Sequence, residues 1–287
     1  MDFKNAAELL SLCRREAVPI SRIMLLRECS LGETDTQAVM QRMAKALSIM
    51  RSSATIPLTQ TVQSMGGLIG GQAQLLSVHA EAGKGICGAV LQKAVTYAMS
   101  VLEVNASMGL IVAAPTAGAS GVVPGLLLAL QEEYNISDER LLYGLLNSGA
   151  IGYLAMRNAT VAGAVGGCQA EVGIASAMAA SAAVELMGGS PEQCLDAAST
   201  VIMNMLGLVC DPVGGLVEYP CQNRNAAGVA NALVAAEMSL SGIRQLIPFD
   251  EMLAVMYRVG RSLPCELKET ALGGCAAAPS ACERCKH

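Results

Sequence analysis

The sequence has 287 residues, is 53% hydrophobic but only 3% aromatic, and carries a formal net charge of −5. A chain of this length can bury one large core or two modest ones, and its acidic balance excludes the basic surface that nucleic acid or an anionic membrane requires. The 11 cysteines are an odd number and no apolar signal peptide opens the chain. We therefore expect a cytoplasmic protein whose thiols serve metal or redox chemistry.

The first 50 residues are expected to form two helices, because apolar side chains recur there at helical spacing. Leu9 and Cys13 share a face of the first helix, and Val39 and Met43 share a face of the second. A proline and a polar stretch around residues 30–35 separate the two.

Two glycine-rich breaks follow. Residues 64–71, Ser-Met-Gly-Gly-Leu-Ile-Gly-Gly, indicate a flexible turn or a close helix contact, and a helix is expected over 86–108. Residues 113–124 then combine hydroxyl groups, glycines and prolines within apolar surroundings. Buried irregular backbone needs hydrogen-bond partners, so such loops commonly line a site.

Further helices are expected over 139–156 and 171–187, and Ser190-Pro191 has the pattern of a helix start. No alternating strand pattern and no long polar linker is found. The sequence thus predicts an all-α fold, a single helical domain whose glycine-rich loops converge on a central site.

A membrane span is the one alternative that hydropathy raises, because residues 104–131 carry no charge and are long enough to cross a bilayer. The stretch contains Asn105, Pro115 and Pro124, which would break the helical ladder at mid-depth, and the chain has no Trp for interfacial anchoring. We expect no membrane association.

Three cysteines are set apart by their surroundings, since Cys168, Cys210 and Cys221 each lie beside Gly or Pro. Such backbone can turn toward a metal and donate N–H groups to sulfur. Their spacings of 42 and 11 residues match no common zinc pattern. Any one of them could be a buried small hydrophobe, but three together would leave one iron of a four-iron cluster open to act as a Lewis acid.

Four sequence blocks carry a resemblance to a known family. They are Asn105-Ala-Ser-Met-Gly, Ala114-Pro-Thr-Ala-Gly-Ala-Ser-Gly, Gly166-Gly-Cys-Gln-Ala-Glu-Val-Gly, and Leu208-Val-Cys-Asp-Pro-Val-Gly-Gly-Leu-Val-Glu-Tyr-Pro-Cys-Gln-Asn-Arg-Asn-Ala. In this order they resemble the α domain of iron-sulfur-dependent L-serine dehydratases, and the resemblance extends from about residue 5 to 279.

The resemblance implies a catalytic domain over residues 1–279, followed by a cysteine-containing tail over 280–287. It implies a [4Fe-4S] cluster on Cys168, Cys210 and Cys221, no pyridoxal phosphate, and conversion of L-serine to pyruvate and ammonia. It also implies a separate β subunit, a homo-oligomer or both. The open iron would polarise the substrate hydroxyl while a base removes the α proton.

Substrate contacts are sought among polar groups in the glycine-lined loops. The candidates are Ser64, Asn105, Thr116 and Ser120, with the backbone N–H groups of Gly66, Gly67, Gly118 and Gly121. Turn capping or helix packing would explain these groups equally well. Arg224 and Asn225 could orient substrate or cluster, although Arg224 could instead pair with Glu218 or Glu171.

The general base stays unassigned. His79 is the sole histidine away from the terminus, but its neighbours are polar and favour a surface position. Lys84 is an alternative only if it is buried.

The C-terminal tail leaves three alternatives open. In similar enzymes a terminal cysteine can ligate the open iron of the resting cluster, and Cys282 or Cys285 could do so here. The tail could also be disordered, or its two cysteines could join Cys265 and Cys275 in a zinc site.

Three other functions are alternatives to the dehydration of L-serine through an open iron. A pyridoxal-phosphate dehydratase, with Lys84 as Schiff base and residues 163–167 as phosphate loop, needs alternating strands and helices that the sequence lacks. A non-catalytic metal-binding subunit would hold a closed cluster indifferent to serine. The same cluster chemistry could also act on L-cysteine or L-threonine, because a pocket distinguishes one methyl by only ~1–3 kcal/mol.

Overall fold

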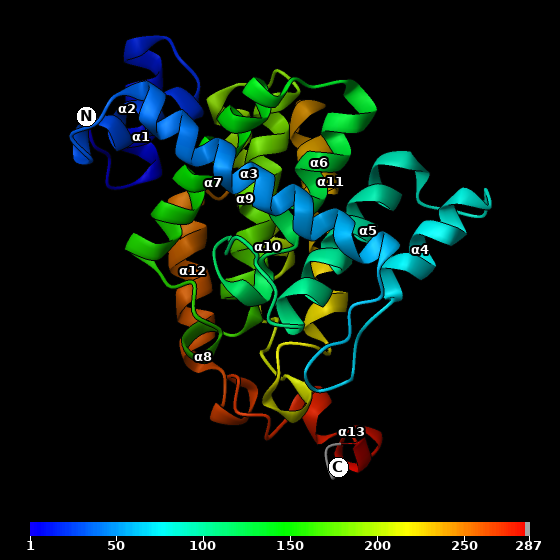
Figure 1. The fold of residues 1–287 in the computed structure, drawn as a ribbon. Coiled ribbons are helices and arrows are strands. Elements are labelled where there is room, and N and C mark those ends of the chain that lie inside the picture. The colour runs from blue at the N-terminus through cyan, green and yellow to red at the C-terminus, as the bar shows by residue number, and fades with distance from the viewer. Residues whose placement is uncertain (285–287) are drawn as a thin grey trace.

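The computed structural model describes residues 1–284, and within them regular structure is helical apart from one isolated bridge between Cys210 and Lys268. The expected all-α fold is confirmed (Figure 1). The α-helices are α1 (Ala6–Glu16), α2 (Ile20–Leu31), α3 (Thr36–Thr59), α4 (Gln72–Glu81), α5 (Gly88–Ala106), α6 (Val122–Tyr134), α7 (Asp138–Asn158), α8 (Gly163–Gly166), α9 (Ile174–Leu186), α10 (Pro191–Asn204), α11 (Cys221–Leu240), α12 (Phe249–Ser262) and α13 (Pro279–Arg284). The short turns are η1 (Ala117–Ala119), η2 (Gln169–Gly173), η3 (Val213–Gly215), η4 (Cys265–Leu267) and η5 (Gly274–Ala277).

Helix α9 forms the centre of the core. All its residues except Glu185 are buried, and it packs against α6, α7, α10 and α11. Alanine and serine dominate its sequence, so neighbouring helices can approach closely around its whole circumference. A second layer forms where α5 packs against α3, α4, α6 and α11.

Polar residues fix where several helices begin. The side chains of Asn5, Asp35 and Ser137 accept hydrogen bonds from the first turns of α1, α3 and α7. Ser190 forms a reciprocal capping box with Gln193, and Pro191 occupies the first turn of α10 as the sequence predicts.

The N-terminal region differs from the prediction, because three helices and not two cover residues 6–59. The prediction missed α2 (Ile20–Leu31). This helix buries Ile20, Ile23, Met24 and Leu25 together with Ser21 and Arg27, so its buried residues are not confined to one apolar face. A helix buried on several sides gives a weak periodic signal.

No helix within residues 1–284 is both long enough and apolar enough to cross a membrane. The uncharged stretch 104–131 is divided among the end of α5, an irregular loop, the turn η1 and most of α6.

Close packing of α5 against α6 depends on Gly125. A Cβ atom added there would lie 2.8 Å from the backbone oxygen of Ala94 and 3.0 Å from Cβ of Ala98. Gly149, in the interior of α7, offers a matched control because the nearest atom to its added Cβ is Met24 Cε at 3.8 Å.

We therefore expect Gly125→Ala to lower the free energy of unfolding by about 1–3 kcal/mol through overpacking. Gly149→Ala should raise it by roughly 0.5–1 kcal/mol, because alanine is the better helix former. Urea denaturation of both variants measures these changes, and equal effects at the two sites would contradict the packing described.

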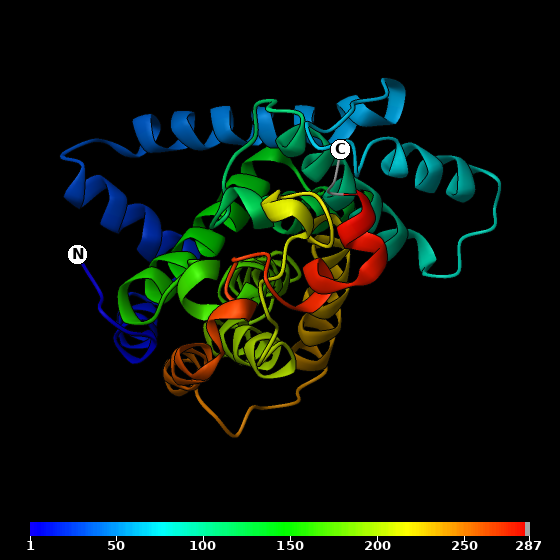
Figure 2. The same cartoon turned by 90° about the horizontal axis from the view of Figure 1, so that it is seen from below.

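The irregular segments gather at one end of the helical body, drawn lowest in Figure 1. The loop before α4, the segment between α10 and α11, and the chain after α12 meet there, and Figure 2 views this end directly. Residues 279–284 pack as α13 against η3 and η5.

Candidate active site

The three singled-out cysteines come from separate segments at this end of the fold. Cys168 immediately precedes the π-helical turn η2, Cys210 lies in the irregular segment between α10 and α11, and Cys221 is the first residue of α11. Cys168 and Cys210 are buried, and Cys221 is half-buried. The thiols lie near enough to one another to interact electrostatically.

The amide of Gln169 connects the first two segments. Its nitrogen donates to the backbone oxygens of Gly166 (2.8 Å) and Met256 (3.1 Å), and its oxygen accepts from Gly207 N–H (2.9 Å). The backbone N–H of Gln169 also donates to Leu208 O at 3.0 Å. Because the Gln169 side chain is 1% exposed, these bonds hold Cys168 in a fixed relation to the segment that carries Cys210.

The segment after α12 is bonded to Cys210 through the backbone. Cys210 N–H donates to Leu267 O at 2.9 Å, and Glu269 N–H donates to Cys210 O at 2.7 Å. Parallel pairing of this kind fixes the backbone on both sides of the cysteine. The residues after α12 thus form part of the site.

Burial dominates the electrostatics of the three thiols. Burial raises the pKa of Cys168 to about 11, although the positive charge of the neighbouring Arg224 lowers that pKa in part. Burial likewise raises the pKa of Cys221 to about 12, and raises the pKa of Cys210 well above its usual range with the help of Glu171. Without a bound cation the thiols are therefore protonated at neutral pH.

Glu171 is a half-buried carboxylate beside this cluster of thiols. Cys210 Sγ donates to its Oε2 at 3.8 Å. Burial raises the pKa of Glu171, and the adjacent Thr116 hydroxyl acts in the opposite direction. A Cβ atom at Gly163 would lie 2.5 Å from Glu171 Oε2 and 3.0 Å from Cys210 Sγ, so glycine there leaves room for both groups.

Arg224 pairs with neither Glu218 nor Glu171, the two acids considered from sequence. Its Nη1 lies 2.6 Å from Asp211 Oδ1 and donates to Val209 O at 2.8 Å. Asp211 Oδ2 also accepts from the backbone N–H of Cys275 at 2.6 Å. Burial raises the pKa of Asp211, but the Cys275 N–H and Arg224 outweigh it and leave that pKa below its usual value.

Glu218 organises the glycine-rich loop at residues 64–71. Its carboxylate is 2% exposed and accepts hydrogen bonds from the Ser64 hydroxyl at 2.7 Å, Gly66 N–H at 2.5 Å and Leu68 N–H at 2.9 Å. The hydroxyl of Ser64 also accepts from Ile69 N–H at 3.2 Å. The donors expected to hold a substrate carboxylate therefore hold a carboxylate of the protein itself.

Asn225 uses its whole amide to join α11 to the loop at residues 113–121. Its oxygen accepts from Gly121 N–H at 3.0 Å, and its nitrogen donates to Gly118 O (2.8 Å) and Cys221 O (2.9 Å). It is fully buried. The arrangement brings the 113–121 loop to the start of α11, where Cys221 lies.

In the same loop the Ser120 hydroxyl is buried and has no hydrogen-bond partner among the described residues, whereas the Thr116 hydroxyl lies next to Glu171 and lowers the pKa of that carboxyl. Unsatisfied buried hydroxyl groups are uncommon in folded proteins and point to an interaction with a group that is not protein. Asn105 is half-buried in the last turn of α5, and its side chain makes no hydrogen bond to a described residue.

A cavity of about 610 Å³ opens between the 64–71 loop, the Cys221 segment and the C-terminal chain. It is large enough for a small amino acid. Its lining comprises Leu68, Ile69, Gln72, Val213, Tyr219, Gln222, Asn223, Cys275, Ala278, Ser280 and Ala281.

Neither candidate for the general base is buried. His79 lies on the exposed side of α4, and Lys84 lies in the exposed loop that follows. The condition set for Lys84, that it be buried, is not met. The exposed position predicted for the His79 side chain is the one observed.

The tail cysteines are described only in part. Cys265 is exposed in η4 and Cys275 is half-buried in η5. Cys282 falls in α13, but its side chain lies outside the described residues, as does the whole of Cys285. The fourth-ligand and zinc-site interpretations of Cys282 and Cys285 therefore stay predictions.

The donor set suits a cluster better than a single ion. In residues 1–284, no group of three or more His, Cys, Asp and Glu side chains has the arrangement of a site for one metal ion. Thiolates of an iron-sulfur cluster bind different irons and lie farther apart than the ligands of one ion. Two buried thiols and one half-buried thiol, carried by turns and a helix start, fit the larger group.

The raised thiol pKa values set the sign of a pH dependence. The ordinary pKa is 9.0, so above it the folded chain keeps protons on Cys168 and Cys221 that the unfolded chain loses. This contribution to stability is present below pH 9 and is lost as pH rises through the folded values.

We therefore expect the free energy of unfolding of the metal-free chain to fall above about pH 9, by up to about 1.4 kcal/mol per pH unit for each thiol. Urea denaturation at a series of pH values tests this, and Cys168→Ala should reduce the slope. A stability that is unchanged between about pH 8 and pH 10 would contradict the burial described.

Sequence reasoning missed the acidic members of the site. Glu171 and Glu218 were considered only as partners of Arg224, and Asp211 was not considered. A carboxylate within an apolar, glycine-rich block itself indicates a polar site, because a protein buries such a charge only where hydrogen-bond donors or cations surround it.

The chain was then compared with known proteins. The profile of the family described as "Serine dehydratase alpha chain" matches residues 15–276. A "Probable L-serine dehydratase, alpha chain" of Bacillus subtilis is 45% identical over 97% of this chain and 92% of its own length. An "L-serine dehydratase, alpha chain" of Peptoniphilus asaccharolyticus is 46% identical over 95% of this chain and 93% of its own. An "L-serine dehydratase" of Helicobacter pylori is 36% identical over 96% of this chain but only 61% of its own length.

Proposed function

Since the chain belongs to the serine dehydratase alpha chain family, we propose that it is an iron-sulfur-dependent L-serine ammonia-lyase, which eliminates water from L-serine to give pyruvate and ammonia. The observation that carries the proposal is that the thiols of Cys168, Cys210 and Cys221, which come from distant segments, lie close enough to interact electrostatically, two of them buried and one half-buried. The proposed location is the cytoplasm, where glutathione and thioredoxin keep such thiols reduced.

Cys168, Cys210 and Cys221 are the proposed ligands of a [4Fe-4S] cluster. When bound, the cluster supplies a Lewis-acidic iron that makes the β-hydroxyl of serine a better leaving group. Arg224 lies beside Cys168 and stabilises its thiolate form against burial. The fixed backbone around Cys210 and the hydrogen bonds of Gln169 hold the ligands in place.

Among the substrate-binding candidates, Ser120 is proposed to contact a ligand because its buried hydroxyl has no partner among the described residues, and Thr116 is proposed to act beside Glu171. Ser64 and Asn225 are proposed to act indirectly, by holding the two glycine-rich loops at the site. Arg224 and Asn105 complete the candidate set. Removal of the α proton together with departure of the β-hydroxyl, as one water in all, converts L-serine to an aminoacrylate, which tautomerises to an imine that water hydrolyses to pyruvate and ammonia.

A separate β subunit is the proposed partner. Relatives named "alpha chain" match this chain over nearly their whole length. The Helicobacter pylori protein, which is named "L-serine dehydratase" alone, matches over only 61% of its length and so extends beyond the matched part.

Product analysis tests the proposed substrate. The anaerobically reconstituted chain is supplied with L-serine, L-threonine or L-cysteine, alone and with the β subunit encoded by the same organism. Pyruvate and ammonia in equal amounts from L-serine are expected. Turnover of L-cysteine to sulfide, or of L-threonine to 2-oxobutyrate, with higher kcat/KM than L-serine would overturn the assignment.

A further inference from the structure

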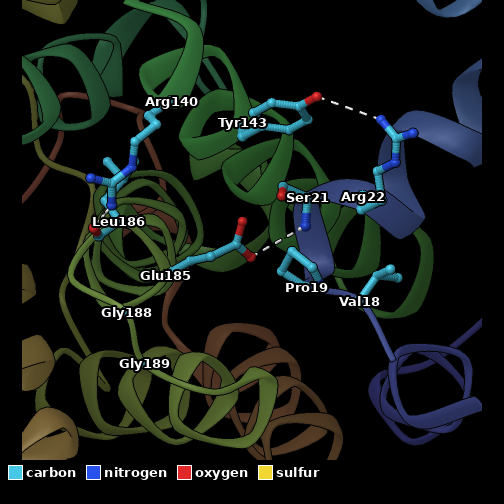
Figure 3. Close-up of a pocket in the computed structure, with 10 residues that line it drawn as sticks. All are labelled: Val18, Pro19, Ser21, Arg22, Arg140, Tyr143, Glu185, Leu186, Gly188 and Gly189. Atoms are coloured by element: carbon cyan, nitrogen blue, oxygen red, sulfur yellow. Dashed lines mark hydrogen bonds between the residues drawn. The ribbon is translucent and has the colours of Figure 1, made fainter. Parts of the chain in front are cut away.

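Two cavities of similar volume could hold a small molecule. One, of about 630 Å³, lies at the end of α9, but Arg22 and Arg140 stand on opposite sides of it with Glu185 between them, so its charged groups do not converge on one ligand (Figure 3). The other is the cavity of about 610 Å³ at the proposed active site. Its lining includes Gln222, a polar side chain that is both buried and fixed in orientation.

The 610 Å³ cavity adjoins the segments that carry two of the three cysteines. Residues on both sides of Cys221 in the chain line it. Cys275 also lines it, and the backbone N–H of Cys275 donates at 2.6 Å to Asp211, the residue that follows Cys210. A molecule in this cavity is therefore next to the proposed cluster ligands.

The side-chain amide of Gln222 can face only one way. Its Nε2 donates to the backbone oxygen of Met99 at 3.2 Å and to Glu103 Oε1 at 3.1 Å, both on α5. A backbone oxygen can only accept, so the nitrogen must face α5, and these two contacts use both of its hydrogens. The Oε1 atom of Gln222 accepts from no described residue, yet it is not one of the sealed unpartnered atoms of the chain, so it borders the cavity that Gln222 lines.

Glu103 holds this orientation from the interior of the protein. It is fully buried near the end of α5, and its Oε1 also accepts from the backbone N–H of Ala73, in the first turn of α4, at 3.0 Å. Its Oε2 is buried and has no hydrogen-bond partner among the described residues. Burial of a carboxyl group with one oxygen unpaired is costly, and the cost is explained if the other oxygen is needed to hold Gln222.

A fixed acceptor on a cavity wall selects ligands that carry a donor at the facing position. The α-ammonium group of L-serine is such a donor, and its hydrogen bond to an amide oxygen is charge-assisted. We propose that Gln222 Oε1 accepts a hydrogen bond from the α-ammonium group of the substrate, and that Glu103 is a positioning residue that turns this oxygen toward the cavity. The contact selects amino acids over acids that lack the amino group. This role rests on the proposed function, since it takes an α-amino acid as the substrate.

L-Alanine and propionate isolate this contact, because they differ by the α-ammonium group and neither has a β-hydroxyl to eliminate. Isothermal titration of the anaerobically reconstituted chain should give a Kd for L-alanine at least about tenfold below that for propionate, the effect of one charge-assisted hydrogen bond. Gln222→Met keeps the approximate length of the side chain and removes the acceptor. It should raise the Kd of L-alanine about tenfold and leave that of propionate unchanged, whereas a purely structural defect would weaken the binding of both.

Variants of Glu103 test its positioning role. Glu103→Gln retains an accepting Oε1 and should keep the preference for L-alanine, while Glu103→Ala releases the Gln222 amide and should reduce that preference. If Gln222→Met does not fold, Glu103→Ala gives the same comparison, because Gln222 keeps its hydrogen bond to Met99 there. Gln92→Met, the same substitution near the other end of α5, is the matched control and should bind both compounds as the wild type does.

The outcomes separate this role from the dehydration itself. No preference for L-alanine in the wild type, including no measurable binding of either compound, would overturn the proposal. A preference kept in full in Gln222→Met or in Glu103→Ala would also overturn it. Pyruvate formation from L-serine is assayed separately, because a chain that shows the preference but forms no pyruvate would contradict the dehydration and not the role of Gln222.

Discussion

Cys168→Ala is expected to abolish the iron-sulfur cluster and with it pyruvate formation. Changing a group that merely supports a metal ligand typically costs 10–100-fold in affinity or activity, so loss of a ligand should cost at least about 100-fold. Cys168 is buried and lies before a π-helical turn. Iron and sulfide content, visible absorbance and pyruvate formation measure the effect.

The matched control for this variant is Cys87→Ala. Cys87 is exposed before α5 and takes no part in the site, so its removal should leave iron content and turnover at the wild-type values. Cys210→Ala and Cys221→Ala should repeat the result for Cys168. Retention of a full cluster in any one of these three would contradict the ligand assignment.

Glu218→Ala should destabilise the 64–71 loop and lower the free energy of unfolding by about 3–5 kcal/mol. The reason is that three donors, the buried Ser64 hydroxyl and the part-buried N–H groups of Gly66 and Leu68, would lose the carboxylate that accepts from them. Urea denaturation gives the overall loss. Hydrogen exchange at the Leu68 amide should report the loop itself, with faster exchange in the variant.

Two comparisons sharpen this result. Glu218→Gln keeps an accepting oxygen but turns an NH2 group toward donors, so it should lose part of the stability and not all of it. Glu139→Ala, at an exposed position of α7, should change the free energy of unfolding by less than about 0.5 kcal/mol. If Glu218→Ala were as stable as Glu139→Ala, the hydrogen bonds to Glu218 would not hold the loop.

Local periodicity predicted the helices with one apolar face or strong end signals. The expected helices at 86–108 and 139–156 correspond to α5 (Gly88–Ala106) and α7 (Asp138–Asn158). Local periodicity did not predict α2, because the buried residues of that helix lie on several sides and the periodic signal is weak. The all-α class followed because alanine-rich helices alternate with glycine-rich breaks, a pattern that close helix packing requires.

The sequence indicated the three cysteines that the structure brings near one another, but not the contacts that support them, and their role as ligands stays a prediction. Glycine and proline near Cys168, Cys210 and Cys221 indicated irregular backbone, and all three lie on turns or at a helix start. The pairing of Arg224 with Asp211 could not be read from sequence, because it depends on how the segments after α10 fold back on each other. The engagement of Ser64 by Glu218, 154 residues away, is long-range for the same reason.

The central claim is that an open iron held by three cysteines acts on L-serine. The most direct test is anaerobic reconstitution with iron and sulfide, followed by an EPR and absorbance titration with L-serine, with pyruvate assayed in the same sample. We predict a four-iron signal that shifts on addition of L-serine, accompanies pyruvate formation and is lost in Cys168→Ala. A colourless protein, or a cluster whose spectrum is unchanged by L-serine, would contradict the account.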